Sequence, residues 1–354
     1  FFNPEDGIRD SVASRGLGDV YKRQILLSLF SWAPAYAAPP TPVKLIFDTD
    51  MGNDIDDALA LAMIHTLADR GECELLAVTV TKDHPQAAPF VDLLNTYYGR
   101  PSIPIGAVKK GMTPEQSKYT VLAGLRDNGK PKYPHDLLDG TQAPNATAIL
   151  RATLAEQPDN SVVIAQVGFS TNLARLMESK PDDYSSLDGM ALIEKKVKHV
   201  EIMAGAFTAI GKNTRFLEYN VVKDIANARK ILQSWPTDVI ASGFEIGIAL
   251  PYPARSILED FRYDKDHPIP AGYQLYEPTP HERPTWDLTS VLHGVRPSHQ
   301  YFELSPRGTI KVHDDGFTEF AASKDGNRQY LILKSSQRER VREAMTSLTS
   351  QPPR

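Results

Sequence analysis

The stretch from Val43 to Ile64, VKLIFDTDMGNDIDDALALAMI, decides the fold class of this chain. VKLIF is typical of a buried parallel strand, and ALALAMI is typical of the first turns of a helix. Five aspartates lie within or beside the segment that joins the two, namely Asp48, Asp50, Asp54, Asp56 and Asp57. We therefore expect them in a strand-to-helix turn at the carboxyl edge of a sheet, where open α/β folds bind their ligands.

The crowding of these carboxylates favours a metal site. Like charges packed this closely repel one another unless a cation neutralises them. A hard divalent cation with oxygen ligands fits best. One acid in a first helical turn is ordinary because of the helix dipole, and Asp54 alone would suit a helix N-cap. Asp56 and Asp57 together, facing Asp48 and Asp50, exceed what capping requires, so the turn is the predicted active site.

Strand-like and helical patterns alternate after this turn, which predicts an α/β fold with an open, mostly parallel sheet and helices on both faces. The expected strands are 43–49, 74–81, 161–167, 198–204 and 237–242. The expected helices are 55–69, 86–98, 144–156, 171–179, 222–234 and 285–294. Regions 106–143 and 251–284 are expected to be loops. YFELS, GTIKVH, FTEFAA and RQYLILK predict short antiparallel strands near the C-terminus, followed by a helix over 336–347.

Composition and the N-terminal region bound the class of protein. The net charge of −5 and the lack of a basic stripe argue against nucleic-acid and membrane-surface partners, and the single Cys73 excludes an intramolecular disulfide. Residues 1–24 are interpreted as a non-native segment, 25–37 as a truncated signal peptide that ends at Ala35-Tyr36-Ala37, and 38–42 as a linker. Residues 43–350 are then a single domain, and we expect export to the periplasm or the extracellular space.

The pattern D-T-D-x-G-x-D-x-D-D-A-x-A-L resembles the calcium-site signature of the inosine/uridine-preferring nucleoside hydrolase family. The resemblance covers roughly residues 43–295. It implies a Ca²⁺ site, with Mg²⁺ as the lesser alternative, in which Asp50 is both a metal ligand and the general base for the bound water. It also implies that Asp57 is a ligand, that Asp56 holds ribose hydroxyls and that Asp48 supports the turn. The paired aspartates come two residues later than in the simplest family pattern, which leaves the role of Asp54 open.

Three later landmarks extend the resemblance, and one family landmark, an Asn after the second strand, is missing. VGFSTNLA resembles a family turn whose carbonyl, here that of Val167, binds the metal. EIMAGA followed by Glu218-Tyr219-Asn220 resembles ribose-binding motifs, so Glu218 and Asn220 inherit sugar contacts, and Asn213 lies near a further sugar-binding position. Pro284-Thr285-Trp286-Asp287 resembles the turn in which Asp287 completes the metal shell. After the second strand, Asp83 is nearest to a ribose-binding Asn.

One departure from the family pattern concerns the leaving group. Trp286 stands where purine-active members have a histidine that protonates the base. Trp286 would instead stack on a ring, and His281 and His293 are nearby candidates for the acid. The family forms dimers or tetramers, so a homo-oligomer is one expectation.

The expected activity is hydrolysis of the N-glycosidic bond of a ribonucleoside or related ribosyl compound, a small molecule, to free base and ribose. Two alternatives stay open. Asp48-x-Asp50 resembles the nucleophile and acid pair of haloacid-dehalogenase-type phosphohydrolases, although Met51-Gly52-Asn53 lacks the usual hydroxyl residue. A calcium-dependent nucleoside- or sugar-binding protein without turnover is the second alternative.

Overall fold

The computed structural model describes residues 41–354, and Pro42–Arg354 form one compact unit. The segment interpreted as non-native, the interpreted signal peptide and most of the interpreted linker lie outside the described residues. Within residues 41–354, no helix combines the length and the apolar content needed to cross a bilayer.

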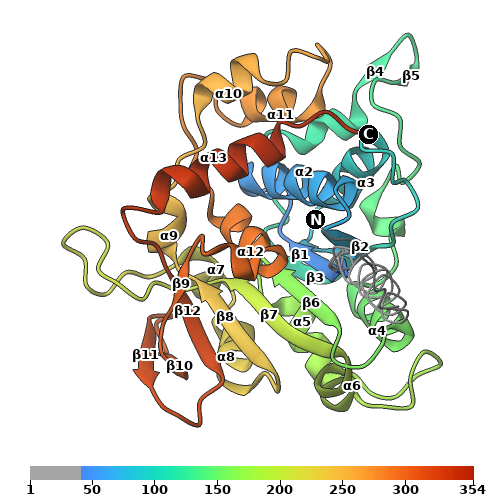
Figure 1. The fold of residues 1–354 in the computed structure, drawn as a ribbon. Coiled ribbons are helices and arrows are strands. Elements are labelled where there is room, and N and C mark those ends of the chain that lie inside the picture. Colours follow the sequence, from blue (N-terminus) through green and yellow to red (C-terminus); the bar gives the residue numbers. More distant parts are fainter. Residues whose placement is uncertain (1–40) are drawn as a thin grey trace, which may run out of the picture. The chain divides into compact units, whose positions relative to one another are not determined.

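A ten-stranded sheet forms the centre of this unit (Figure 1). Its strand order is β11-β10-β12-β8-β7-β6-β1-β2-β3, and β9 pairs with β12. The run from β8 to β3 is parallel throughout, and β12 joins it by pairing parallel with β8. Strands β10 and β11 continue the sheet in antiparallel pairing. The strands are β1 (Val43–Thr49), β2 (Cys73–Lys82), β3 (Ile105–Met112), β6 (Val162–Gln166), β7 (Val197–Met203), β8 (Asp238–Ser242), β9 (Glu303–Leu304), β10 (Gly308–Val312), β11 (Thr318–Ala322) and β12 (Arg328–Ile332).

Helices cover both faces of the sheet, because side chains of β1 alternate between two hydrophobic clusters. Leu45 and Phe47 belong to one cluster, and Ile46 belongs to the other. The helices on the first face include α2 (Asp56–Asp69), α3 (Ala87–Tyr97), α11 (Pro268–Tyr276), α12 (Trp286–Val295) and α13 (Arg338–Thr349). Those on the second include α4 (Ala146–Glu156), α5 (Thr171–Glu178), α6 (Gly189–Lys196) and α8 (Ile225–Ser234). Three short helices, α7 (Tyr219–Lys223), α9 (Phe244–Ile248) and α10 (Ala254–Glu259), lie in connections.

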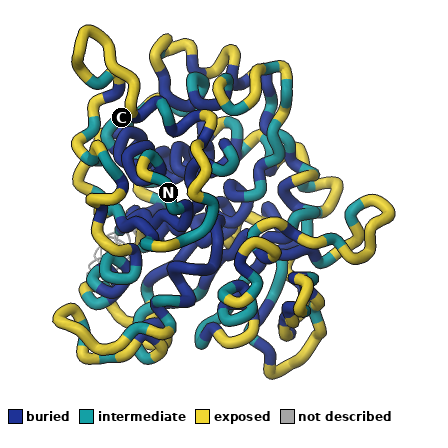
Figure 2. The backbone as a smooth tube through the Cα atoms, turned by 180° about the vertical axis from the view of Figure 1, so that it is seen from behind, coloured by how far each residue is buried: buried dark blue, intermediate teal, exposed yellow. Residues whose placement is uncertain are grey.

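The burial pattern follows from this arrangement. Every residue of β6 is buried, and so are the first twelve residues of α2, from Asp56 to Leu67. Figure 2 shows the continuous buried core of strands and inner helices, with exposed loops around it. A strand that is buried on both faces has an unbroken apolar sequence. The central strands could therefore be predicted from the sequence.

The fold confirms the α/β class, the mostly parallel sheet and the short antiparallel strands near the C-terminus. Two expected loops were wrong in part. Region 106–143 begins with edge strand β3 and contains the hairpin β4 (Arg126–Asp127) and β5 (Lys130–Pro131). Region 251–284 contains α10 and α11, because the prolines of α11 stand in its first turn, where a missing N–H costs nothing. The helix expected over 222–234 divides at Asp224 into α7 and α8.

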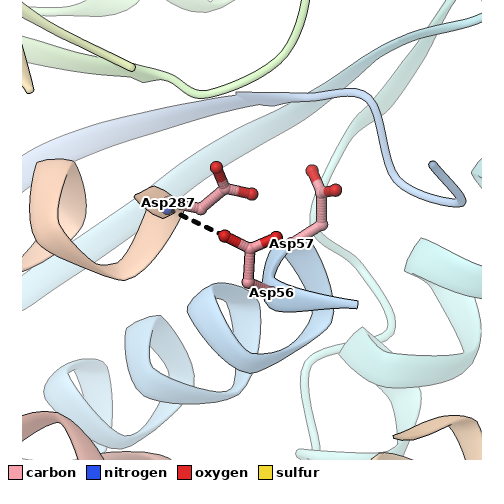
Figure 3. A group of neighbouring side chains, drawn as sticks. All are labelled: Asp56, Asp57 and Asp287. Carbon is pink, nitrogen blue, oxygen red and sulfur yellow. Dashed lines mark hydrogen bonds between the residues drawn. The ribbon is translucent and has the colours of Figure 1, made fainter. Parts of the chain in front are cut away.

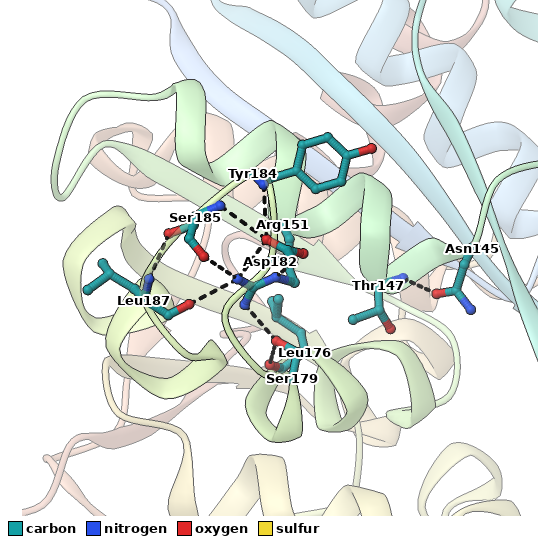
Figure 4. Close-up of polar contacts among 9 residues, drawn as sticks. All are labelled: Asn145, Thr147, Arg151, Leu176, Ser179, Asp182, Tyr184, Ser185 and Leu187. Carbon is teal, nitrogen blue, oxygen red and sulfur yellow. Dashed lines mark hydrogen bonds and ion pairs between the residues drawn. The ribbon is translucent and has the colours of Figure 1, made fainter.

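A buried arginine fixes the loop that follows α5. Arg151 of α4 binds both carboxylate oxygens of Asp182, through Nε at 2.6 Å and Nη2 at 2.9 Å (Figure 4). It also donates to the carbonyls of Ser185 and Leu187 and to the hydroxyl of Ser179. Because α5 starts at the carboxyl edge of the sheet and ends at this loop, the network holds α5 in place beneath the site described next.

Candidate active site

A cavity of about 530 Å³ opens at the carboxyl edge of the parallel strands. The turn between β1 and α2 forms one wall, and the ends of β6 and β7 form the floor beside it. Further lining comes from the start of α7, the loop after β3, Phe244, and the residues Tyr276, Arg283, Trp286 and Asp287. This is the place where open α/β sheets bind ligands, and it agrees with the position expected for the acidic turn.

Three aspartates converge from two distant parts of the chain. Asp56 and Asp57 begin α2, and Asp287 lies in the first turn of α12. One carboxylate oxygen from each lies within 4.8 Å of the others (Figure 3). The backbone N–H of Asp287 donates to Oδ2 of Asp56 at 3.1 Å, which joins the two helix N-termini directly. The dipoles of both helices favour negative charge at this point.

Burial and mutual repulsion make this cluster costly without a cation. Burial, and then the charge of Asp54, raise the pKa of Asp56 well above its usual range. Burial, and then neighbouring aspartates, likewise raise the pKa of Asp57 and of Asp287. Oδ1 of Asp57 accepts a hydrogen bond from the Thr49 hydroxyl, whereas its buried Oδ2 has no partner among the described residues. An unpartnered buried carboxylate oxygen within an all-oxygen cluster suits a hard divalent cation.

Asp50 and Val167, two of the metal ligands that the family resemblance implies, both line this cavity. Oδ2 of Asp50 accepts a hydrogen bond from the Asn53 amide at 2.7 Å, and burial raises the pKa of Asp50 to about 6. The carbonyl of Val167 accepts one bond, from Asn220 at 2.9 Å, and a carbonyl oxygen has two lone pairs. The expected ligands Asp50, Asp57, Val167 and Asp287 therefore share one cavity, and Asp56, expected only at the sugar, belongs to the compact carboxylate cluster.

Asp48 supports the site from inside the protein. Its side chain is fully buried, it does not line the cavity, and it accepts hydrogen bonds from Thr79 at 2.5 Å and Asn172 at 2.9 Å. Its backbone carbonyl accepts from the N–H of Val167 at 2.7 Å, which aligns the ends of β1 and β6. A carboxylate enclosed in this way cannot act as the nucleophile that the phosphohydrolase alternative requires.

Asp54 is bound by Arg283, a residue that sequence patterns did not single out. The guanidinium donates to the carboxylate through Nε at 2.8 and 2.9 Å and also through Nη2, across 229 residues of sequence. Asp54 is not the helix N-cap, a position occupied by Ile55 without a side-chain hydrogen bond. The turn is also anchored by Tyr119, whose hydroxyl accepts from Gly52 N–H at 2.7 Å and donates to the Asp54 carbonyl.

Glu218 and Asn220, the expected ribose contacts, line the cavity at the start of α7. Glu218 caps this helix by accepting from the N–H groups of Asn220 at 2.8 Å and Val221 at 3.1 Å, and it also accepts from Gly205 N–H. Burial raises the pKa of Glu218 to about 7. The Asn220 amide nitrogen donates to the carbonyls of Val167 and Met203, so its side-chain oxygen is the atom left to contact a ligand.

Trp286 lines the cavity within an aromatic group. Its Nε1 donates to the Phe244 carbonyl at 2.9 Å, and its ring lies 5.1 Å from that of Phe244. Neither histidine proposed as a replacement acid lines the cavity. Nδ1 of His293 is 2.9 Å from the carboxylate of buried Glu201, and the ring of His281 is stacked on Tyr273.

Two expected sugar contacts lie outside the cavity lining. The carboxylate of Asp83 turns to edge strand β3, where it accepts from Gly111 N–H at 3.0 Å. Asn213 is exposed in a turn with Ile210, and its side chain accepts from Arg215 N–H at 2.9 Å. The residue that faces the cavity after β2 is Lys82, whose ammonium donates to Asn53 Oδ1 and the Thr113 carbonyl, both at 2.8 Å. Lys82 directly precedes Asp83, so a register shifted by one residue would have identified it as the residue that faces the cavity.

Comparison with known proteins decides the family. Residues 45–289 match the family described as inosine-uridine preferring nucleoside hydrolase. The chain belongs to this family. The matched region contains both halves of the aspartate cluster, so the resemblance drawn from the acidic turn is confirmed at the level of the family.

Individual relatives are more distant. The chain is 27% identical over 225 residues to a protein described as probable uridine nucleosidase 2 of Oryza sativa subsp. japonica, a match that covers 62% of each protein. It thus spans about six tenths of the length of that curated relative. The fold resembles that of a plant nucleoside hydrolase, with a TM-score of 0.64, 21% identity and coverage of 88% of this chain and 100% of the other. It also resembles an inosine-uridine preferring nucleoside hydrolase from Bacillus anthracis, with a TM-score of 0.64, 18% identity and coverage of 87% and 99%.

Proposed function

We propose that the protein hydrolyses the N-glycosidic bond of a ribonucleoside or related ribosyl compound, giving ribose and the free base. The observation that carries this proposal is the convergence of Asp56, Asp57 and Asp287 in one cavity within the family-matched region. A cluster built from both ends of that region is a feature of the whole fold rather than of a local helix start.

The protein's own groups suit the needs of this reaction. The transition state of glycosidic cleavage resembles an oxocarbenium ion and requires a water, a held sugar and a stabilised leaving group. Asp50 would accept the proton of the attacking water, and burial raises its pKa to about 6, closer to neutrality than that of an exposed aspartate. Glu218 and Asn220 would orient the ribose hydroxyls from the start of α7.

A divalent cation, Ca²⁺ in preference to Mg²⁺, is part of the proposal. Asp50, Asp57 and Asp287, with the Val167 carbonyl, are the residues proposed to hold it, and Asp56 stands within reach of the same ion. When bound, such a cation orients a water and lowers its pKa. The all-oxygen donor set and its flexible carboxylates favour Ca²⁺, which accepts irregular coordination more readily than Mg²⁺ does.

Binding without turnover is the second candidate. Trp286 occupies the position of the expected leaving-group acid, and no histidine is among the cavity-lining residues of the described chain. A cavity with an aromatic wall and no histidine acid would bind a nucleoside well and cleave it slowly. The two candidates differ in one measurable quantity, the release of ribose.

The test is a reducing-sugar assay over a panel of ribonucleosides, with Ca²⁺ or with chelator, on wild type and on Asp57→Asn. Hydrolysis predicts ribose release that chelator and the substitution both suppress. Saturable binding of nucleoside without ribose release would select the binding protein. Ribose release that survives both treatments would refute the metal-dependent mechanism.

We also propose export, on the basis of the apolar segment ILLSLFSW and the following Ala35-Tyr36-Ala37. Fractionation of cells that express the chain, with N-terminal sequencing of the product, checks it. A product that stays in the cytoplasm with residues 25–37 attached would contradict it.

A further inference from the structure

Arg283, a cation, lies in the cavity three residues before Trp286, the position at which a histidine acid was expected. The cationic side chains that line the cavity are Lys82, Lys118 and Arg283. Lys82 is bound between Asn53 and Thr113, and Lys118 donates to the Tyr276 carbonyl at 3.0 Å. The Lys118 ammonium also lies 5.1 Å from the ring centre of Tyr276. Among these three cations only Arg283 contacts two aromatic rings, with its guanidinium carbon 5.1 Å from the ring centre of Tyr276 and 5.4 Å from that of Trp286.

Asp54 fixes the orientation of this guanidinium without using all its donors. Arginine carries five N–H groups in a rigid planar fork. Those on Nε and Nη2 meet the Asp54 carboxylate. Nη1 makes no hydrogen bond to any described residue. The ion pair is half-buried, with side-chain exposures of 27% for Arg283 and 22% for Asp54, so its geometry is held by the protein while one edge stays accessible.

The neighbours of Arg283 suit a planar ligand. Tyr276 and Trp286 both lie against the Arg283 guanidinium, and Phe244, which also lines the cavity, has its ring 5.1 Å from that of Trp286. The faces of aromatic rings bind flat, conjugated groups. The aspartate cluster and Glu218 are suited to the hydroxyl-rich sugar. The aglycone of a nucleoside is its flat, conjugated part. We therefore expect the aglycone to bind against Tyr276 and Trp286, with the bond to the sugar between these rings and the aspartate cluster.

We propose that Arg283 stabilises the negative charge that develops on the leaving group, and that the enzyme therefore prefers ribosyl compounds whose aglycone departs as an anion. This inference rests on the proposed hydrolase function. In the step, the bond from C1′ to the aglycone breaks and its electron pair stays on the aglycone. The water oxygen bonds to C1′, Asp50 takes the water proton, and the anion beside Arg283 is protonated later by solvent. The interaction is electrostatic: burial alone would lower the pKa of Arg283, but the hydrogen bonds and charge of Asp54 raise it above its usual value, so the guanidinium keeps its protons.

The test compares leaving groups within one enzyme preparation. The substrates are phenyl β-D-ribofuranoside and its 4-nitrophenyl analogue, which share a sugar and differ in the acidity of the phenol released. The ratio of their kcat/KM values does not depend on how much of the preparation is folded. The ratio is the kcat/KM of the 4-nitrophenyl compound divided by that of the phenyl compound. In wild type, stabilisation of the phenolate by Arg283 should keep this ratio small. In Arg283→Gln, kcat for the phenyl compound should fall by on the order of 10²-fold, while the nitrophenyl compound loses much less.

Two further variants separate charge from structure. Arg283→Lys keeps the charge but loses the fork, so its ratio should fall between those of wild type and Arg283→Gln, and added guanidinium should restore cleavage of the phenyl compound by Arg283→Ala. Arg296 forms a comparable two-pronged pair with Glu72, at 2.6 Å for each bond, near the amino end of β2 and away from the cavity. Arg296→Gln should lower the melting temperature and leave the ratio unchanged.

The possible results distinguish the role of Arg283 from the proposed hydrolase function. A larger ratio in Arg283→Gln, absent from Arg296→Gln, supports the inference. An equal loss on both substrates in Arg283→Gln refutes it while leaving the hydrolase function intact. If wild type releases no ribose from either compound or from any nucleoside, the proposed function fails and this inference fails with it.

Discussion

The backbone N–H of Asp287 is bound to the carboxylate of Asp56 at 3.1 Å, although 231 residues separate them in the chain. The bond brings the N-termini of α2 and α12 together, so that two positive helix ends face the aspartate cluster. The carboxylates are thereby held in place before any ligand arrives. A site organised in this way loses little entropy when it captures a cation, and its stability depends strongly on charge.

The first prediction concerns cation binding and pH. In the metal-free fold, burial and mutual repulsion raise the pKa of Asp56, Asp57 and Asp287 above the unfolded value of 3.8. The folded state therefore binds more protons than the unfolded state above pH 3.8. Because of this difference, the free energy of unfolding falls as the pH rises. A cation competes with those protons. We expect the increase in Tm caused by Ca²⁺, relative to chelator, to grow from pH 5 to pH 8 in thermal unfolding. A pH-independent increase would contradict this.

The second prediction concerns Asp57→Asn in the metal-free protein. Removing one charge from the repelling cluster should stabilise this form by on the order of 1 kcal/mol, or roughly 2–4 °C in Tm. The same change removes a buried oxygen that has no protein partner, so the Ca²⁺-dependent rise in Tm should be lost. Asp264→Asn, at a partly exposed residue outside the cavity, is the control and should retain that rise. A substituted protein that is less stable without metal and still responds to Ca²⁺ would overturn the proposed role.

The third prediction concerns Gly168, which follows the proposed carbonyl ligand Val167. A Cβ at Gly168 would lie 2.4 Å from the backbone nitrogen of Asp50, a distance that real Cβ atoms do not adopt. Gly168→Ala should therefore displace Asp50, cost about 1–3 kcal/mol of unfolding free energy and remove most activity. Gly124→Ala, whose Cβ would meet only the Gln86 side chain at 3.5 Å, is the matched control. Urea denaturation and ribose release, measured on both, check the prediction, and equal behaviour of the two variants would disprove it.

The fourth prediction concerns His65, which is fully buried in α2, 3.0 Å from the Asn95 side-chain oxygen and stacked on Tyr98. Burial, and then the charge of Arg100, lower its pKa to about 3, compared with 6.5 in an unfolded chain. The unfolded state thus takes up a proton first, and the stabilising effect of His65 declines as the pH falls from 6.5 towards 3. His65→Gln should be less stable than wild type at pH 7, and the difference should shrink by about 1.4 kcal/mol for each pH unit below 6.5.

Urea denaturation at several pH values measures that difference. His299→Gln, at an exposed position, is the surface control. A constant difference between wild type and His65→Gln from pH 7 to pH 5 would show that the ring does not titrate as argued.

Local sequence patterns predicted the sheet and half of the site. Ile46 and Phe47 belong to an apolar run that only a strand buried on both faces explains, and the aspartates follow it directly. Strand β3 was missed because Gly106 and Gly111 and the lysines between them dilute its apolar pattern, although Gly106 packs against Ala146 too closely to allow a side chain.

The far wall of the cavity could not be derived from spacing. Nothing local to Arg283 marks it as the partner of Asp54, since an ion pair across 229 residues depends on the whole fold. The same reason explains Asp83 and Asn213, whose distances along the chain suited a sugar contact but whose side chains point to other partners. The residues of the cavity beyond the acidic turn that were expected in advance, namely Val167, Glu218, Asn220, Trp286 and Asp287, all came from family motifs.

The pairing of Asp56 with Asp287 also orders events during synthesis. Asp56 leaves the ribosome 231 residues before Asp287, so the acidic turn is synthesised well before its partner. Its counterpart arrives only when the helix that begins at Trp286 has emerged and docked. A nascent or prematurely terminated product would therefore be inert towards cation and substrate alike, and the protein would acquire its chemistry in a single late step.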